Sequence, residues 1–557
     1  MLRSHSLALA AGACVMLSLS AAAETPAGST LKVKSGVIQT PVVSNSADSA
    51  DAVPAPAPCT VTLFNNFQFV NFNAQYFTYT PSCPGPWSKV VFKGNFAITP
   101  GIQFDRTAEI SLGYVNIYYG TTREDDPTFG PTWNVTRDLT DYSSLFNTAE
   151  PGEVDLGNEV NSEYTGVITG TATLDFYPVP AGGTAPLVAD AVYPLPDGPG
   201  GAVALDSGTS LLSQTFTLPT NIESAYLDVF AQSQSDDEFW WSCAPNDVAG
   251  ELDDCGNTAF RETEISIDGN PAGVAPVYPW IFTGGIDPTL WLPIPDVQTL
   301  NFVPYRVDLT PFAATLSNGQ PHTVSLSVYN ADNYFLVTAA LLVYEDHGST
   351  TVTGATTTNT IGSGPTPVVS ENINIDSNGV PVGTILVTSQ RQFSVSGYVN
   401  TSHGTVTTTL SQSVDFSNSQ DYTETSNTYV QTTNVTSSKN VVTGGSTQTI
   451  NQQFTYPLNV LLTLGTAPNG DEDETIAVKQ AYDRSATTQS NGTTTDYTAA
   501  TQNYAGADTT DLVTGDDLLQ NSQLLSTFTT NQTCTQKQIK AHDDLVVSET
   551  LSPCTQQ

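Results

Sequence analysis

Positive charge is scarce in this chain of 557 residues. The sequence has 16 Lys and Arg against 55 Asp and Glu, which gives a formal net charge of −39. Such an anionic surface repels nucleic acid and anionic membranes, so we expect neither as a partner. The simplest explanation of the charge is solubility outside the cell.

Motifs that hold metals or build a serine nucleophile are also lacking. Beyond the N-terminus, His322, His347, His403 and His542 stand alone, and no CxxC pair occurs. A zinc site needs clustered Cys and His at short spacings, so we predict no catalytic metal. The absence of a GxSxG elbow argues against Ser-His-Asp catalysis.

Helical periodicity is nearly absent as well. No long window repeats apolar residues at three and four positions. Instead, β-branched and aromatic runs such as 88–98, 110–119 and 163–177 alternate with Gly, Pro and Asn clusters, a pattern typical of antiparallel strands. With 39% hydrophobic and 13% charged residues the chain should fold. We predict an all-β protein.

The N-terminus has the features of an export signal. Residues 1–23 contain Arg3, an apolar run and three final alanines, and this order indicates a cleaved signal peptide and a secreted or periplasmic protein. Residues 24–57 are rich in Ala, Ser, Pro and Val, which is typical of a linker. No later apolar run suggests a membrane anchor.

Six cysteines follow the predicted signal peptide. An even number in an exported chain favours disulfides, and six cysteines allow many pairings. We expect nearest neighbours to pair: Cys59 with Cys83, Cys243 with Cys255, and Cys534 with Cys554.

Composition also divides the chain into regions. A Gly/Pro-rich stretch at 194–201 separates two strand-rich regions, which we interpret as jelly-roll β-sandwiches over 58–200 and 201–348. Residues 349–367 resemble a linker because they are rich in Thr, Gly and Ser. A β-rich accessory domain is expected over 368–515, and a Cys-containing tail over 516–557.

Acidic and aromatic residues gather in three short runs of the second region. These runs are 236–241, 260–262 and 282–288, followed by Trp291. Carboxylates can activate water and donate protons, while tryptophan faces suit the C–H faces of sugar rings. The mixture favours hydrolysis of a carbohydrate-linked bond.

These runs, with others at 101–106, 133–145 and 305–312, resemble the peptide-N-glycosidase A family. The resemblance spans roughly 57–460. It implies an amidase that hydrolyses the bond between asparagine and N-acetylglucosamine in N-glycosylated peptides or denatured glycoproteins, without a cofactor. It also implies two jelly rolls side by side, as in peptide-N-glycosidase F, which performs the same reaction.

Carboxylates in the matching runs are the candidate catalytic groups. The resemblance selects Asp105 as the leading catalytic carboxylate, with Arg106 beside it to hold a substrate oxygen. Glu238 is the second acid, because its aromatic neighbours should desolvate it and raise its pKa. Such a partly protonated pair favours an acidic pH optimum. Glu124 and Glu262 are lesser candidates.

Substrate binding is assigned to a second set of residues: Asp237, Trp240, Trp241, Arg261 and Trp291. Each set has a purely structural alternative. Asp105 with Arg106 forms a buried ion pair, Glu262 with Arg261 a strand salt bridge, and the acids at 236–238 a solvated loop. The tryptophans would then be core residues.

Three departures from the family pattern leave other functions open. Ile102, Thr136 and Leu292 stand where the family commonly has Arg, Glu and Arg. Lost polar contacts there favour a glycan-binding protein without catalysis as one alternative. A glycoside hydrolase is another, because paired carboxylates serve that chemistry equally well.

Overall fold

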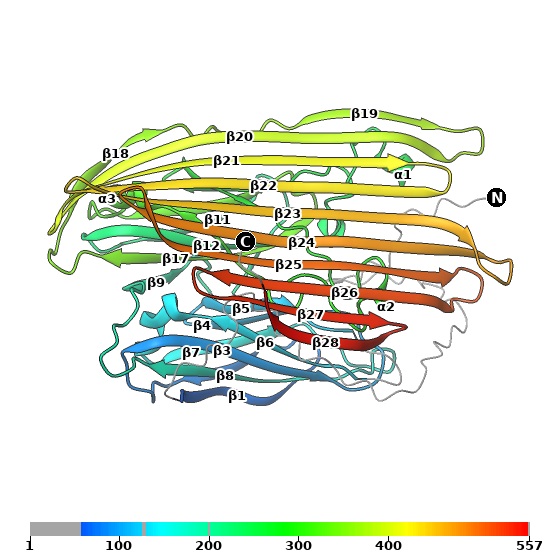
Figure 1. The fold of residues 1–557 in the computed structure, drawn as a ribbon, viewed down its shortest axis with the longest axis horizontal. Helices are drawn as coiled ribbons and strands as arrows, with labels where there is room; N and C mark the ends of the chain where they lie inside the picture. The colour runs from blue at the N-terminus through cyan, green and yellow to red at the C-terminus, as the bar shows by residue number, and fades with distance from the viewer. Residues whose placement is uncertain (1–56, 125–129, 199–200, 555–557) are drawn as a thin grey trace.

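The described part of the chain folds mainly into antiparallel β-sheets, which confirms the predicted all-β class. The computed structural model describes residues 57–124, 130–198 and 201–554. Figure 1 shows the arrangement: a first sandwich at the bottom of the view, and one large sheet of long strands crossing the front.

The first sandwich contains strands β1 to β8. One sheet has the order β1-β8-β3-β6 and the other β2-β7-β4-β5, which is the order of a jelly roll. The strands are β1 (Cys59–Phe69), β2 (Gln75–Tyr79), β3 (Trp87–Ile98), β4 (Thr107–Leu112), β5 (Val115–Thr121), β6 (Thr132–Asp138), β7 (Glu150–Leu156) and β8 (Ile168–Pro178), with a 3-10 helix η1 (Thr140–Asn147).

The second sandwich repeats this order with β10-β17-β12-β15 and β11-β16-β13-β14, and β9 adds to β17. Its strands are β9 (Ala191–Pro194), β10 (Val203–Leu205), β11 (Leu212–Phe216), β12 (Ile222–Gln234), β13 (Glu262–Ile267), β14 (Asn270–Pro276), β15 (Tyr305–Asp308), β16 (His322–Tyr329) and β17 (Tyr334–Glu345). Its helical turns are η2 (Ser235–Asp237), α1 (Ala249–Leu252), α2 (Pro288–Trp291), η3 (Thr310–Phe312) and α3 (Ala313–Leu316). Two jelly rolls were predicted, and both are present.

The C-terminal part forms one sheet of 11 strands in the order β18-β20 through β28, with β19 also pairing β20. The strands are β18 (Thr353–Asn359), β19 (Val368–Ile375), β20 (Pro381–Thr401), β21 (Gly404–Tyr422), β22 (Ser426–Thr443), β23 (Ser446–Thr466), β24 (Glu472–Ser490), β25 (Thr493–Asp511), β26 (Asp517–Thr530), β27 (Cys534–His542) and β28 (Leu545–Pro553). We call it the large sheet.

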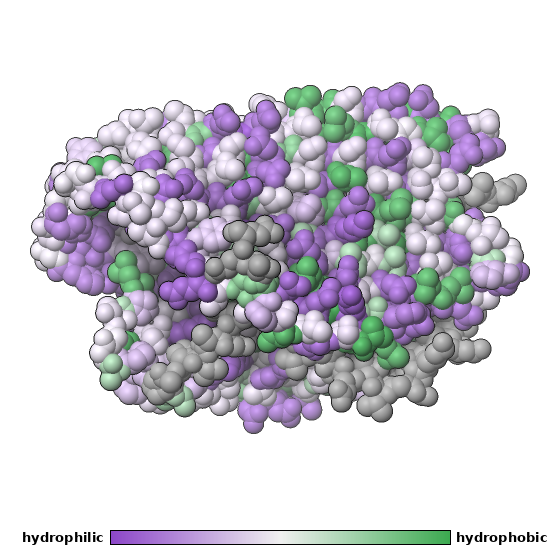
Figure 2. All heavy atoms as spheres, viewed as in Figure 1, coloured by the Kyte–Doolittle hydropathy of each residue, from purple (hydrophilic) through white to green (hydrophobic). Residues whose placement is uncertain are grey.

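The large sheet shares its core with the second sandwich. Along β20, Val387, Phe393 and Val395 are buried, while the residues directly before and after each of them are half-buried or exposed. This alternation turns one apolar face inward. The buried residues of that face belong to the same hydrophobic cluster as those of the second sandwich. Apolar residues on the face seen in Figure 2 are scattered among polar ones.

The domain organisation differs from the sequence-based expectation in three places. The expected linker at 349–367 contains β18, because its threonines are β-branched and favour strands. The expected tail at 516–557 supplies β26, β27 and β28 to the large sheet. The expected C-terminal β-rich domain is present, but the sheet that forms it begins before residue 368, continues past residue 515 and packs on the second jelly roll.

All three predicted disulfides are confirmed. Cys59–Cys83, Cys243–Cys255 and Cys534–Cys554 have Cα–Cα distances of 5.8, 4.5 and 5.0 Å. The predicted signal peptide and nearly all of the predicted linker at 24–57 lie outside the described residues. Among the described residues, no helix has the length and apolar character needed to cross a membrane.

The two jelly rolls meet along β5. Thr121 donates its backbone N–H to Thr299 at 2.8 Å, and Phe302 donates to Tyr119 at 2.8 Å. The Tyr119 hydroxyl reaches across to Gln232 Oε1 on β12 at 2.7 Å. This contact brings the start of β4 and the end of β12 together, where the candidate site lies.

Candidate active site

A cavity of about 490 Å³ is lined by residues of both jelly rolls. The first contributes Phe72, Asp105, Arg106, Glu109, Glu124 and Asp155; the second contributes Gln234, Glu238, Phe239, Gly284 and Tyr334. Four of the five predicted catalytic residues therefore line one cavity. Glu262 does not.

Asp105 lies just before β4, against the loop that carries Gly284. Its Oδ1 accepts a hydrogen bond from the Gly284 N–H at 3.2 Å, and its own N–H donates to Glu124 Oε1 at 3.3 Å. A Cβ on Gly284 would lie 2.2 Å from Glu124 Oε1 and 2.4 Å from Asp105 Oδ1. Only a glycine allows both carboxylates to approach this backbone.

Glu238 reaches the cavity from the turn after β12. Its N–H donates to Ser235 O at 2.9 Å, which closes the η2 turn. Burial raises the pKa of Glu238 to about 8, and the charge of Asp105 adds to the effect. Burial also raises the pKa of Asp105 to about 6, although Arg106 and the Gly284 N–H oppose it. Asp105 and Glu238 therefore titrate as one coupled pair, which holds one proton between these two values.

Arg106 forms part of the cavity wall between two aromatic rings. Its guanidinium carbon lies 5.7 Å from the ring centre of Phe72 and 5.8 Å from that of Phe104. Its Nε and Nη2 donate to Gln103 Oε1 at 3.1 and 2.5 Å. The guanidinium is thus fixed beside Asp105, where it favours the ionised carboxylate.

Asp237 and Arg261 hold the turn that carries Glu238. They form a buried ion pair at 2.8 Å between Nη2 and Oδ1. Asp237 Oδ2 also accepts the N–H groups of Asp332 and Asn333 at 2.8 and 3.0 Å. Neither residue lines the cavity, so their expected role in substrate binding is corrected to a structural one.

Glu262 lies on β13 and pairs with Arg391 of β20, which also bonds Glu264 at 3.1 Å. Burial raises the pKa of Glu262 to about 7 even though Arg391 lowers it. This pair joins the second jelly roll to the large sheet. The expected catalytic role of Glu262 is therefore corrected, because Glu262 does not line the cavity and its carboxylate pairs with Arg391.

The predicted sugar platforms Trp240, Trp241 and Trp291 are buried, with 0, 0 and 1% exposure. Their ring neighbours in the large sheet are Phe416, Tyr429 and Tyr504. Trp291 Nε1 donates to Gly285 O at 2.7 Å. The structural alternative is the correct one here: these rings pack the large sheet onto the second jelly roll.

Sequence reasoning missed several cavity residues, above all Phe72, Glu109, Asp155 and Tyr334. Glu109 and Asp155 lie directly opposite each other on β4 and β7. Burial, with a smaller contribution from Asp155, raises the pKa of Glu109 well above its usual range. An acid between the apolar residues Ala108 and Ile110 of a strand was the available signal for Glu109. Nothing in the sequence placed Phe72 near Arg106.

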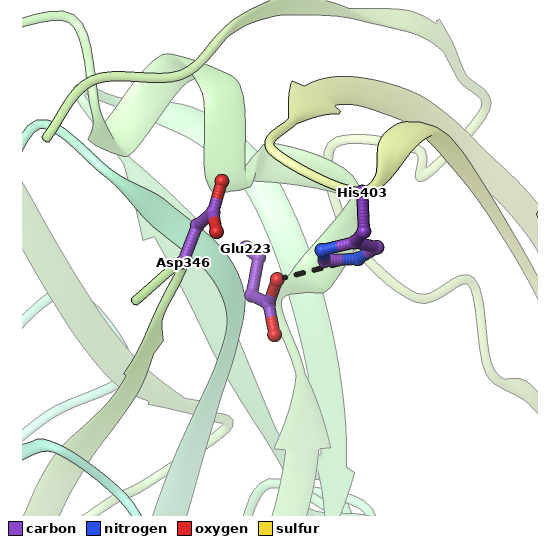
Figure 3. Close-up of side chains that lie close together, drawn as sticks. All are labelled: Glu223, Asp346 and His403. Carbon is purple, nitrogen blue, oxygen red and sulfur yellow. Dashed lines mark ion pairs between the residues drawn. The ribbon is translucent and has the colours of Figure 1, made fainter. Parts of the chain in front are cut away.

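One group of side chains among the described residues has metal-ligand types: Glu223, Asp346 and His403 (Figure 3). Their candidate atoms lie within 4.8 Å of one another. His403 Nε2 pairs with Glu223 Oε2 at 3.6 Å, and Asp346 already accepts from Ser402 and Gly348. The group is accounted for by these contacts, and none of its members lines the cavity.

Two jelly rolls that share a cavity with a half-buried carboxyl pair define a class of protein suited to hydrolysis. Residues 41–361 match the family described as peptide N-acetyl-beta-D-glucosaminyl asparaginase amidase A, and residues 384–458 match its C-terminal domain. The chain belongs to this family.

One curated relative agrees with this placement. The peptide-N4-(N-acetyl-beta-glucosaminyl)asparagine amidase A of Prunus dulcis is 31% identical over 390 residues, which cover 66% of this chain and 67% of that protein. Solved structures of PNGase F from Flavobacterium meningosepticum and of PNGF-II align with TM-scores of 0.36 and identities of 15 and 12%. They cover 52 and 53% of this chain, and 96 and 66% of the respective solved chains.

Proposed function

We propose that this chain is an amidase that releases N-glycans by hydrolysing the amide bond between asparagine and N-acetylglucosamine. Family membership supports the reaction type. The observation that carries the proposal is the carboxyl pair Asp105 and Glu238, which lines one cavity with pKa values raised to about 6 and about 8. Glycopeptides or denatured glycoproteins are the expected substrates.

The two carboxyl groups divide the proton transfers of the reaction. Asp105, ionised above about pH 6, takes a proton from water as the oxygen attacks the amide carbon. Glu238, protonated below about pH 8, gives its proton to the nitrogen as the C–N bond breaks. The products are aspartate in the peptide and a glycosylamine, which then loses ammonia in water.

Arg106 supplies the positive charge for this step. An amide oxygen becomes negative as water adds, and a fixed cation in a partly dry cavity stabilises that charge. The stack with Phe72 and Phe104 and the bonds to Gln103 hold the guanidinium in place before substrate arrives. Preorganised charge of this kind costs no rearrangement during the reaction.

Two variants test the assignment on a synthetic N-glycopeptide. Asp105→Asn and Glu238→Gln should each lower the rate of glycan release by at least about 100-fold, the usual contribution of a positioned acid or base. Asp236→Asn is the matched control, because Asp236 lies in the same turn but is exposed and outside the cavity. The control should keep wild-type activity.

Other outcomes would assign other functions. Normal release by a folded Asp105→Asn variant would remove this residue from the mechanism. Tight glycopeptide binding without any release would favour a glycan-binding protein. A sugar left on the asparagine would indicate a glycoside hydrolase. We also propose that the protein is exported, which N-terminal sequencing of the protein from the culture medium would test.

A further inference from the structure

Residues 282–291 connect the proposed active site to the large sheet, and we call them the bridging segment. Phe282, Gly284 and Pro288 of this segment line the cavity, and the Gly284 N–H donates to Asp105 Oδ1 at 3.2 Å. Helix α2, at the end of the same segment, contacts β25 and β26 of the large sheet. The bridging segment thus touches a proposed catalytic carboxyl group and the C-terminal part of the chain.

Tyr504 of β25 holds the bridging segment from the large sheet. Its ring centre lies 5.1 Å from that of Trp291, and its hydroxyl donates to Leu290 O at 3.4 Å. Gln520 of β26 donates its side-chain amide to the same carbonyl at 3.4 Å. Tyr504 and Trp291 are 2 and 1% exposed, so water does not compete for this contact.

Thr289 provides a second attachment, at the first turn of α2. Its hydroxyl bonds Asp508 of β25, a fully buried residue, and Asp287 Oδ1 at 2.7 Å. Asp287 Oδ1 also accepts the Thr289 N–H at 3.1 Å and so caps the helix. The large sheet therefore holds α2 at its first turn as well as at Leu290 and Trp291.

Short hydrogen bonds within the bridging segment connect these attachments to Gly284. Trp291 Nε1 and the Asp287 N–H both donate to Gly285 O, each at 2.7 Å. Ile286, between the two glycines and α2, has a φ of +64°. A β-branched residue rarely adopts this left-handed conformation, which persists only where the surrounding structure fixes it. The shape of the segment thus depends on the contacts that hold it.

The position of the Gly284 N–H affects how readily Asp105 ionises. This donor lowers the pKa of Asp105, against the rise that burial causes. Arg106, Glu124 and Glu238 also face Asp105, and none of them belongs to the bridging segment. Movement of the Gly284 N–H away from Asp105 would therefore raise the pKa of Asp105 while these three groups stay in place.

We propose that Tyr504 and Thr289 are positioning residues, through which the large sheet holds the Gly284 N–H on Asp105. Neither residue lines the cavity, so both act through the bridging segment. The inference rests on the amidase function proposed above. It gives the C-terminal part of the chain a role in the reaction, in addition to the core that it shares with the second jelly roll.

The test compares the pH profiles of kcat/KM on an N-glycopeptide for Tyr504→Ala and the wild type. The rise of kcat/KM with pH reports the ionisation of Asp105. Loss of one hydrogen bond to this carboxylate should move the rise to higher pH by about one unit, which lowers kcat/KM about tenfold below pH 6. Tyr504→Phe keeps the ring on Trp291 and should restore the wild-type profile.

Thr289→Val tests the same proposal from α2, because it removes the hydroxyl that bonds Asp508. The rise should again move to higher pH, and Thr289→Ser should restore it. Tyr456→Ala is the matched control: Tyr456 also belongs to the large sheet, is 3% exposed and packs on Tyr278 at 5.1 Å. The control should lose stability but keep the rise in place. An unmoved rise in both Tyr504→Ala and Thr289→Val, or an equal shift in the control, would overturn the proposal.

Hydrogen exchange followed by mass spectrometry gives a readout that does not depend on turnover. Peptides that cover the bridging segment should exchange faster in Tyr504→Ala and Thr289→Val than in the wild type and in Tyr456→Ala. If the wild type releases no glycan, the amidase proposal fails, while the exchange rates still decide whether the large sheet holds the segment. Equal exchange of the segment in all four proteins would overturn that part.

Discussion

A methyl group on Gly284 should disable the site without unfolding the protein. In Gly284→Ala, the added Cβ would lie 2.2 Å from Glu124 Oε1 and 2.4 Å from Asp105 Oδ1. Gly284 is absent from the left-handed residues, so its backbone accepts alanine and the effect is steric. Each carboxylate must move by about 1 Å to reach ordinary contact distance.

The size of the effect follows from that displacement. A misplacement of about 1 Å in a catalytic group costs roughly 100-fold in rate, or about 2.7 kcal/mol of transition-state stabilisation. The assay is kcat/KM on a two-sugar glycopeptide, with thermal unfolding measured in parallel. Gly250→Ala is the control, because nothing lies within 4 Å of its added Cβ.

A kcat/KM of Gly284→Ala within about threefold of the wild-type value would contradict this prediction. It would mean that neither carboxylate needs its present position. Loss of activity together with a large loss of stability would also count against the account, since it would place the role of Gly284 in folding.

Other perturbations test the charges. The pKa of Asp105 is raised to about 6 and that of Glu238 to about 8, so kcat/KM should rise as pH increases through about 6 and fall as it increases through about 8. The pH optimum is therefore expected nearer neutrality than the acidic optimum predicted from the sequence. A flat pH profile would contradict the assignment of these two groups as acid and base. Arg261→Ala leaves Asp237 buried and unpaired, so the free energy of unfolding should drop by about 3–5 kcal/mol, and a drop in chemical denaturation below about 1 kcal/mol would contradict this. Burial raises the pKa of Asp508 in the folded protein to about 9. The stability that the protonated Asp508 contributes is therefore fully present below its pKa in the unfolded chain, and it is lost as pH rises through about 9. Asp508→Asn should therefore raise the melting temperature at pH 8 and change it little at pH 4, and the opposite order would refute the sign.

The sequence predicted well what local patterns control. Alternating apolar residues and turn clusters gave the strands of both jelly rolls, since a strand buries one face by a period of two. The short spacings between neighbouring cysteines predicted the three disulfides correctly. The motif around Asp105 and the acid beside aromatic residues at Glu238 identified two side chains that line one cavity.

What the sequence could not give depends on contacts between distant segments. Glu262 meets Arg391 across 129 residues, so a residue that resembled an active-site acid is an ion-pair partner. The tryptophans were wrongly predicted to bind sugar, because the large sheet covers the face on which they lie. Phe72 and Asp155 line the cavity because the β1–β2 turn and β7 lie near the start of β4. No local sequence pattern predicts this arrangement.

In the proposed reaction, water adds to the asparagine side chain and not to the sugar. Mass spectrometry of a defined N-glycopeptide after incubation in water labelled with oxygen-18 tests this directly. We expect the peptide to return with aspartate carrying one heavy oxygen and the glycan to leave intact. Recovery of unlabelled asparagine, with or without an attached sugar, would contradict it.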